Sequence, residues 1–557
     1  MGQDQRDPGP TGAETTAMTR AGFVHRIAGV GLALPAAGSL LRDTPSLARE
    51  SAAHPIPGPP WRGGKRGGVG SVAWPDKTVT YDPPLAYDQG GYYGLANFFR
   101  GLLYFDSKAT PQLDLADSME ISADGKRYRF KLKQGVTFHN GRELTANDFK
   151  YTLERSSSKK IGSWVGGFLS SVQGHAAFAA GKAKHISGIK TPSKYVLELH
   201  LSSPDVTIPG VLAIPPFYVL PEEEVTRLGK NFAFNPIGTG PFKLKTWDKS
   251  GARYRAVRNE TYVYGKSLPY LDELDWQWNV PETLEYLRVK SNKLDATGGN
   301  LAQAPSIVAQ LRAKKDKNYA EWGSFTLQWF ELNTTQKPFD DVRVRKALNY
   351  AVNKERFASL LIDATGHFFP PKLLGYEPGL KTYDYDPDKA RALLKEAGVS
   401  GLELTVPILG GGTGRPEQLI QQDLKQVGIK VNLVQNQSSV YDLGSKLSSK
   451  YPLWYKAWGM GLPDPSELVS SLIGTGAPSN YSGWGNSTVD ELGAKAKAIT
   501  NRARRAATYV AIEKRLLDEA PFIFIGVATW VTAHSDRLQN FNWEPVVYEH
   551  WDRFWTR

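Results

Sequence analysis

The sequence predicts an α/β fold, and three patterns along the chain carry this prediction. In residues 127–133, Tyr128, Phe130 and Leu132 alternate with basic residues, which is typical of a strand with one buried face. Residues 342–351 repeat apolar side chains at helical spacing. The segments LELTVPIL and RPEQLIQQDLKQVGIKVNLV indicate a strand, a helix and a second strand in succession. This alternation predicts a mainly parallel sheet with crossover helices.

Length and composition set the class of protein. The chain of 557 residues is long enough for three or four domains with large buried cores. Its 68 basic and 56 acidic residues give a formal net charge of +12 and are spread along the chain. This spread favours weak attraction to anionic envelope surfaces over nucleic-acid binding. The absence of cysteine excludes disulfides, thiol catalysis and thiolate metal sites.

Residues 1–41 predict a disordered start followed by a secretory signal peptide. Residues 1–17 are polar, and Met18 opens a charged start, an apolar run and small residues. The stretch TRAGFV is similar to a twin-arginine export motif, with Ala21 in place of the second arginine. Residues 27–41 are too short and too rich in glycine for a membrane span, which needs about 20 apolar residues. The start codon and the cleavage site stay open, between Met1 and Met18 and among Ala37, Ala48 and Ala53.

Folding is expected to begin after a tether. Residues 42–68 are rich in Pro, Gly, Ser and Ala, which predicts a flexible linker. A strand then opens at Val69, and the following helix is expected to end at residues 101–103. The turn Asn140-Gly141 precedes a capping box, Thr145 to Asp148, which predicts the start of an amphipathic helix.

The helix of residues 342–351 has a predicted inner and outer face. Val344, Ala347, Leu348 and Ala351 line the buried face, and Arg343, Arg345 and Lys346 are expected to face away. A further helix is expected to begin after Asp386, with Pro387 in its first turn, and to stop at Gly398.

The segment ISADGKRYRFKLKQGVTFHNGRELTANDFKYTLER resembles the signature region of the extracellular solute-binding proteins of family 5. These are the peptide- and dipeptide-binding receptors of ABC importers. The blocks NPIGTGPFKL and KPFDDVRVRKALNYAVNKE continue the resemblance in the family's order, and it covers residues 69 to 550. It implies an α/β, two-lobed periplasmic-binding-protein-like fold (class II) with an extra inserted α+β domain. We expect lobe I in residues 69–100, 206–325 and 525–557, the inserted domain in 101–205, and lobe II in 326–524.

The resemblance also implies a function. The protein would be the exported substrate-binding component of an ABC importer, in the periplasm or at the envelope exterior. It would capture a peptide-like or other small organic solute between its lobes and deliver it to a membrane permease that an ATPase drives. We expect a monomer that uses no catalytic residue, cofactor, metal or nucleic acid. The chain lacks the lipidated N-terminal cysteine of many relatives, which puts membrane tethering in doubt.

The resemblance places the ligand against the segment WYKAWGMGLPDP of residues 454–465. In peptide-binding members, an aspartate three positions before the Pro-Asp-Pro aspartate pairs with the peptide's amino terminus. Gly461 stands there in this chain, and it cannot neutralise a buried ammonium group. We therefore expect a ligand without a free α-amine, and Gly461→Asp is expected to improve dipeptide binding.

Other candidate binding residues have structural alternatives. Trp458 and Met460 offer a flat face and an adaptable thioether, or pack in the core. Asp464 can contact ligand, but with Pro465, Ser466 and Glu467 it also forms a capping-box pattern. The remaining candidates are Tyr87, Tyr481 and Trp484, whereas Asn333 is expected to hold backbone.

Two other functions compete with solute transport. A secreted glycan or peptide hydrolase would use tryptophan platforms with a carboxylate pair, for which Asp464 and Glu467 are the first choice. The sequence contains neither an HExxH nor a GxSxG motif. A secreted peptide chaperone would use the same binding site without a transporter.

Overall fold

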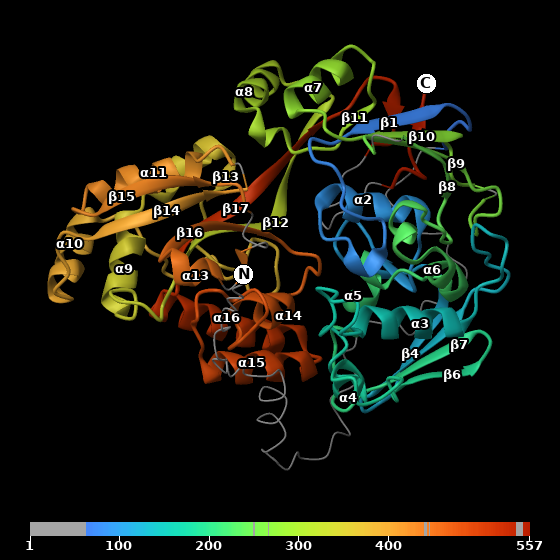
Figure 1. Cartoon of the computed structure of the whole chain (residues 1–557), viewed down its shortest axis with the longest axis horizontal. Coiled ribbons are helices and arrows are strands. Elements are labelled where there is room, and N and C mark those ends of the chain that lie inside the picture. The colour runs from blue at the N-terminus through green and yellow to red at the C-terminus, as the bar shows by residue number, and fades with distance from the viewer. Residues whose placement is uncertain are drawn as a thin grey trace, which may run out of the picture. The chain divides into compact units, whose positions relative to one another are not determined.

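The computed structural model describes residues 63–557 apart from 249–250, 266, 411, 439–442, 445 and 542–549. The predicted disordered start, the signal peptide and most of the predicted tether lie outside these residues. The helices and strands of Figure 1 are grouped around three larger sheets, which we name the β1, β5 and β12 sheets.

The β1 sheet has five strands in the order β11-β1-β10-β9-β8. Their bounds are β11 (Ala296–Thr297), β1 (Val69–Ala73), β10 (Glu273–Gln277), β9 (Arg253–Arg258) and β8 (Phe242–Trp247). Aromatic rings fill its core: Trp276 stacks between Trp74 and Tyr254, with ring centroids 6.0 and 5.8 Å away. This packing places α2 (Gln89–Phe98) against the sheet through Tyr93, which stacks on Trp74 at 5.1 Å.

The β5 sheet carries the segment that resembles the family signature. Its order is β4-β5-β7-β6, with bounds β4 (Ala116–Ile121), β5 (Arg127–Leu132), β7 (Val196–His200) and β6 (Ile189–Ser193). The predicted alternation holds, because Tyr128, Phe130 and Leu132 are buried. The predicted capping box also forms at α3 (Ala146–Ser157), where the Asp148 carboxylate accepts from the Thr145 amide at 2.8 Å.

The β12 sheet has the order β13-β17-β12-β16, and all its pairs are antiparallel. The bounds are β13 (Ile362–Asp363), β17 (Phe522–Ala533), β12 (Tyr319–Leu332) and β16 (Leu453–Gly459). The long strands β12 and β17 run side by side in Figure 1, and their register shifts between Gly323 and Leu327. A separate parallel pair, β14 (Glu403–Leu409) and β15 (Lys430–Asn436), is joined through α11 (Arg415–Lys425).

The prediction of a mainly parallel sheet was wrong. Within the described residues, only β1–β10, β1–β11 and β14–β15 pair in parallel. The strand–helix–strand pattern was identified correctly around α11, but the other large sheets are built mainly from antiparallel pairs. Tight connections such as that between β8 and β9 permit only antiparallel pairing.

Short pairs and helices complete the structure. The pairs are β2 (Leu103–Phe105) with β3 (Pro111–Leu113), and β18 (Leu538–Gln539) with β19 (Trp555–Thr556). The α-helices not yet given are α4 (His175–Ala179), α5 (Ile208–Ala213), α6 (Glu222–Leu228), α7 (Glu282–Lys290), α8 (Pro305–Lys314), α9 (Val342–Ala351), α10 (Pro387–Glu396), α13 (Lys446–Lys450), α14 (Pro465–Leu468), α15 (Ser487–Ala498) and α16 (Arg502–Glu519). The other short helices are η1 (Pro83–Leu85), η2 (Pro215–Phe217), η3 (Gly229–Phe234), η4 (Leu301–Gln303), η5 (Lys354–Leu360) and η6 (Val469–Ile473).

Two local predictions also need correction. The first long helix, α2, ends at Phe98 rather than at residues 101–103, where β2 already begins. Arg345 does not face solvent, because its guanidinium donates to the carbonyl oxygens of Phe339 and Glu519, each at 2.9 Å from one nitrogen. Backbone acceptors thus satisfy the buried charge, which helical periodicity could not reveal.

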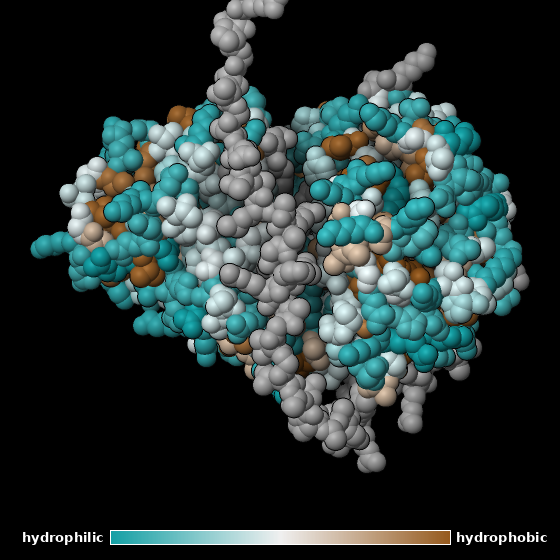
Figure 2. Space-filling view, turned by 60° about the horizontal axis from the view of Figure 1, so that its bottom comes forward, coloured by the Kyte–Doolittle hydropathy of each residue, from teal (hydrophilic) through white to brown (hydrophobic). Residues whose placement is uncertain are grey.

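The surface is predominantly polar. On the face seen in Figure 2, hydrophilic residues predominate and hydrophobic ones form small, separate groups. The large hydrophobic side chains that are exposed in the described part of the chain are scattered, apart from two on α7, Leu284 and Leu287: the others are Val69, Val79, Tyr87, Ile121, Phe234 and Tyr385. Single apolar side chains of this kind are normal on protein surfaces.

Candidate functional site

The candidate site is built on one face of β16. Because side chains alternate along a strand, three of its residues share this face: Trp454, Lys456 and Trp458. Their cross-strand partners on β12 share it too: Glu331, Trp329 and Leu327. The face therefore combines a row of indoles with a buried pair of opposite charges.

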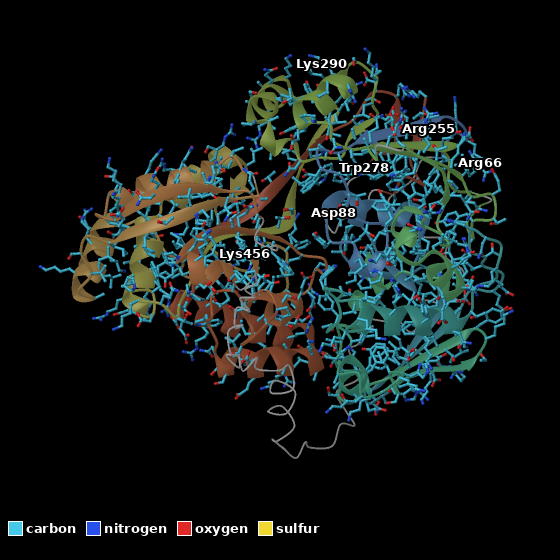
Figure 3. The ribbon with its side chains drawn as sticks, viewed as in Figure 1. Arg66, Asp88, Arg255, Trp278, Lys290 and Lys456 are labelled. Carbon is cyan, nitrogen blue, oxygen red and sulfur yellow. The ribbon has the colours of Figure 1, made fainter. Side chains whose placement is uncertain are left out.

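The buried charge pair joins Lys456 to Glu331. The Lys456 ammonium lies 2.8 Å from the Glu331 carboxylate, and both side chains are 1% exposed. Burial lowers the pKa of Lys456 and raises the pKa of Glu331, and their mutual attraction opposes both shifts. Figure 3 labels Lys456 in the region of the β12 sheet, and its low exposure shows that it is buried there. The two charges are therefore shielded from water, and the pair supports the structure of the site.

This pair holds the loop that carries Tyr481. Lys456 donates to the Ser479 carbonyl at 2.6 Å, and the Tyr481 amide donates to Glu331 at 3.0 Å. The Lys456 ammonium also lies 4.4 Å from the centre of the Tyr481 ring. Tyr481 is half-buried, so part of its ring remains accessible.

A second buried carboxylate, Glu467, organises the loop after β16. It accepts a hydrogen bond from the Trp458 indole nitrogen at 2.8 Å, and others from the amides of Gly461 and Leu462. Burial raises the pKa of Glu467 to about 7, although these donors favour its ionised form. Among the described residues it pairs with no cationic side chain. Its role is to fix the Trp458 ring and the backbone of residues 461–462.

Asp464 begins α14, as predicted from its capping pattern. Its carboxylate accepts from the Ser466 amide at 3.0 Å and forms an ion pair with Arg505 at 2.7 Å. Burial would raise the pKa of Asp464, but Arg505 outweighs it and the pKa is lowered. The other half of the predicted capping box is wrong, because Glu467 bonds to Trp458 and the loop amides instead of the Asp464 amide. A ligand contact of Asp464 stays a prediction.

Gly461 faces two aromatic side chains from the N-terminal half of the chain. A methyl group at Gly461 would lie 2.7 Å from the Trp164 ring and 3.3 Å from the Tyr92 hydroxyl. That hydroxyl donates to the Gly461 carbonyl at 3.3 Å, while the Trp164 indole donates to the Ala86 carbonyl at 3.2 Å. The backbone at Gly461 is therefore enclosed by side chains of α2 and of the segment after α3.

The other residues named from the sequence each lie in surroundings of their own. Met460 is 2% exposed and packs in the core, as the alternative interpretation held. Trp484 is 5% exposed, and its indole donates to Glu519 at 2.8 Å, in a network apart from Glu467. Tyr87 is 60% exposed beside Asp88, the residue that caps α2 (Figure 3). Asn333 holds backbone as predicted, donating to Ser448 and accepting from Thr335.

The structure thus brings Trp458 and Gly461 together through Glu467, and Tyr481 into the same region through Lys456. Four residues of this region were not predicted from the sequence: Trp164, Tyr92, Glu331 and Lys456. A signal existed for Lys456 and Glu331, because each is a charged residue inside a strand of large apolar side chains. Nothing local distinguishes Trp164 from the other 14 tryptophans.

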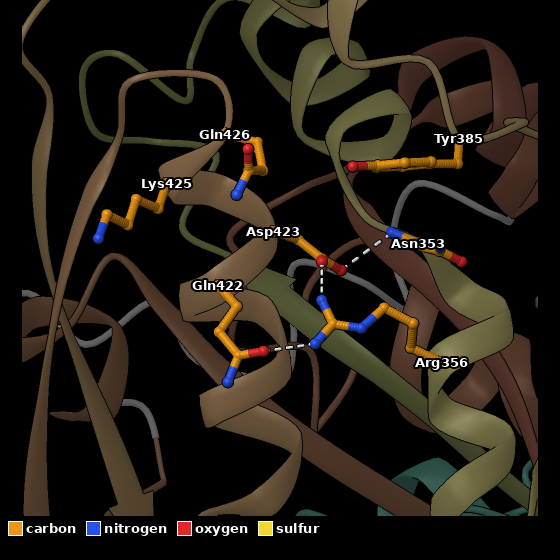
Figure 4. Close-up of a pocket in the computed structure, with 7 residues that line it drawn as sticks. All are labelled: Asn353, Arg356, Tyr385, Gln422, Asp423, Lys425 and Gln426. Carbon is orange, nitrogen blue, oxygen red and sulfur yellow. Dashed lines mark hydrogen bonds and ion pairs between the residues drawn. The ribbon is translucent and has the colours of Figure 1, made fainter.

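Two cavities lie elsewhere in the described structure. One of about 380 Å³ is lined by polar residues of η5 and α11 and by Tyr385, and in it Arg356 bonds to Asp423 and Gln422 (Figure 4). The other, of about 500 Å³, lies between residues 375–377 and one face of α16. Neither is lined by a predicted binding residue, so neither defines the candidate site.

The described residues hold neither a cluster of metal ligands nor a long apolar helix. They contain no group of three or more His, Asp or Glu side chains arranged to hold a metal ion. None of the helices within the described ranges has the length and apolar character to cross a bilayer.

Comparisons with known proteins give a consistent result. The family model "Bacterial extracellular solute-binding proteins, family 5 Middle" matches residues 110–480. The chain is 28% identical over 481 residues to the glutathione-binding protein GsiB of Pectobacterium atrosepticum, covering 83% of this chain and 89% of that protein. It is 27% identical over 466 residues to the dipeptide-binding protein of Escherichia coli K12, covering 79% and 85%.

The fold is shared with solved binding proteins. The ABC transporter-associated periplasmic binding protein DppA of Helicobacter pylori, in complex with the peptide STSA, superposes with a TM-score of 0.75. Its identity is 24%, and the match covers 88% of this chain and 98% of that chain. The predicted fold class, an α/β two-lobed binding-protein fold, is confirmed.

Proposed function

Because the chain belongs to the bacterial extracellular solute-binding proteins of family 5, we propose that it captures a small peptide-like solute without a free α-amine and delivers it to an ABC permease. Solute binding is its function, in preference to the hydrolase alternative. The names of its relatives, which refer to glutathione and dipeptides, support a peptide-like ligand.

The environment of Gly461 is the single observation that carries the proposed ligand class. Position 461 has no side chain, and Trp164 occupies the space into which one would project. The buried carboxylate beside it, Glu467, accepts hydrogen bonds from three N–H groups of the protein. An ammonium group brought to this loop would lose its hydration without gaining a counter-charge, which is costly.

Binding without catalysis is part of the proposal. The carboxylate pair of the hydrolase alternative is engaged in structural roles, Asp464 with Arg505 and Glu467 with Trp458. We further propose export through the N-terminal signal, action as a monomer at the envelope exterior, and permease and ATPase subunits as partners.

Native mass spectrometry of the full chain tests the proposal through co-purified solute. A bound species that lacks a primary amine is the expected result, and amine-reactive labelling of the released solute checks it. A mixture of ordinary free-amine peptides would contradict the proposed ligand class while leaving solute binding intact. Turnover of a peptide or glycoside, lost in Asp464→Asn, would contradict the binding-only function.

A further inference from the structure

Trp164 is the side chain nearest to the point where a side chain at position 461 would begin. Its ring atom Cη2 lies 2.7 Å from where a methyl group on Gly461 would stand, and another ring atom lies at 3.4 Å. The two residues are far apart in the sequence, since Trp164 follows α3 and Gly461 follows β16. The indole thus takes the place of a side chain that position 461 does not provide.

The Trp164 ring is held in place by residues 84–86 and by Phe168. The indole nitrogen donates to the Ala86 carbonyl at 3.2 Å, and the neighbouring Ser163 hydroxyl donates to the Pro84 carbonyl at 2.5 Å. Phe168 meets the ring edge-on, with centroids 5.7 Å apart and planes at 85°. A ring fixed in this way loses little further freedom when a ligand packs on it.

The ring remains half-buried, so it has surface to offer. It packs near the rings of Tyr92 and Phe168, bonds to the Ala86 carbonyl and lies beside Gly461. None of these groups carries a charge. Aromatic faces of this kind favour flat, apolar groups of a ligand.

The charges nearest to Gly461 are already satisfied. Glu467 accepts hydrogen bonds from the amides of residues 461 and 462, and Asp464 forms an ion pair with Arg505. Tyr92 uses its hydroxyl on the Gly461 carbonyl. Both carboxylates are therefore engaged by groups of the protein itself.

We infer that Trp164 is a specificity-determining residue of the site: it fills the space in which a carboxylate at position 461 would neutralise an ammonium group, and it packs against an uncharged, N-blocked end of a solute. The inference rests on the proposed function and adds the residue that enforces the ligand class. It also revises the expectation for Gly461→Asp, because the new side chain would meet the Trp164 ring. To gain binding of a free amine, the protein would need both an aspartate at position 461 and the loss of the Trp164 ring.

Isothermal titration calorimetry with Ala-Phe and N-acetyl-Ala-Phe tests the inference on the full chain. The wild type is expected to bind the acetylated dipeptide at least about tenfold more tightly than the free one. Trp164→Ala is expected to lower affinity for the acetylated form about tenfold and to reduce this preference, and Trp164→Phe to retain most of it. The double variant Trp164→Ala, Gly461→Asp is expected to prefer the free dipeptide, whereas Gly461→Asp alone gains nothing.

Phe178→Ala is the matched control, because Phe178 is a half-buried aromatic residue of α4, the helix that follows Trp164 in the chain. It is expected to keep the wild-type preference, and circular dichroism checks that every variant folds. The inference is overturned if Trp164→Ala binds both dipeptides as the wild type does. It is also overturned if Gly461→Asp alone gains amine binding, or if the wild type does not bind the acetylated dipeptide.

The co-purified solute separates failure of this inference from failure of the proposed function. A solute without a primary amine that binds Trp164→Ala as tightly as the wild type overturns only the role of Trp164. Free-amine peptides bound to the wild type overturn the proposed ligand class and the inference together.

Discussion

The indole nitrogen of Trp458 donates a hydrogen bond of 2.8 Å to the buried carboxylate of Glu467, nine residues further along the chain. The same carboxylate binds the amides of Gly461 and Leu462. One side chain thereby fixes an aromatic ring and the backbone beside it. Because the group is ionisable, the order of this loop is linked to pH.

Glu467→Gln is expected to remove a pH dependence of stability. Burial raises the pKa of Glu467 from 4.5 to about 7, so the folded protein retains a proton that the unfolded chain releases. The free energy of unfolding therefore falls as pH rises through this window, and this contribution is fully present only below pH 4.5. Urea unfolding at pH 5 and pH 8 measures it: the wild type should lose stability relative to the variant at the higher pH.

Glu403→Gln is the control for this measurement, since Glu403 lies on the surface in a pair with Lys430. The prediction is contradicted if the free energies of unfolding of the wild type and Glu467→Gln differ by the same amount at pH 5 and at pH 8. In that case the carboxylate would be ionised throughout.

Lys456→Met is expected to destabilise the protein by about 3–5 kcal/mol, because it leaves the buried Glu331 without its counter-charge. The double variant Lys456→Met, Glu331→Gln should recover part of this loss. Urea unfolding checks both, with Lys430→Met as a control in a solvent-exposed pair, whose loss should matter little. Equal losses in Lys456→Met and Lys430→Met would refute the role of burial.

Asp464→Ala is expected to cost more than the roughly 1 kcal/mol of a helix cap, because it also leaves Arg505 without its carboxylate. Asp464→Asn keeps a capping oxygen and loses only the charge. Thermal unfolding should therefore rank wild type, Asp464→Asn and Asp464→Ala in order of decreasing stability. A smaller effect of alanine than of asparagine would show that the cap contributes nothing.

Gly526→Ala is expected to destabilise the protein by about 3 kcal/mol or more, because a methyl group there would overlap the Asp363 carbonyl of β13. Gly323 offers a matched control on the paired strand β12, since a methyl group there meets nothing within 4 Å. Gly323→Ala should change stability by about 0.5 kcal/mol or less. Chemical unfolding of the two variants compares them directly, and similar losses would contradict the steric explanation.

Local patterns in the sequence predicted much of the secondary structure. Tyr128, Phe130 and Leu132 alternate into the core, and Asp148 closes its capping box, because both features depend on neighbouring residues alone. Strand pairing depends on the whole topology, so the parallel sheet was predicted too broadly. Arg345 shows the same limit, since its acceptors at Phe339 and Glu519 come together only in the folded chain.

The site was predictable only in part, for a related reason. The resemblance directed attention to residues 454–465, and the structure joins Trp458, Gly461 and Glu467 there. The contact of Trp164 with Gly461 joins distant segments, and no spacing in the sequence encodes it. The predicted domain boundaries stay predictions, and so do the ligand contacts of all the predicted site residues: Tyr87, Trp458, Met460, Gly461, Asp464, Tyr481 and Trp484.

The backbone amide of Val206, before α5, donates to the carbonyl of Lys497 in α15 at 2.9 Å. An amide exchanges its hydrogen for deuterium while its hydrogen bond is open. Deuterium uptake at Val206 therefore reports the fraction of time for which these two parts of the chain are separated. A solute that stabilises their contact is expected to slow the uptake, and this amide would then report ligand capture without a label.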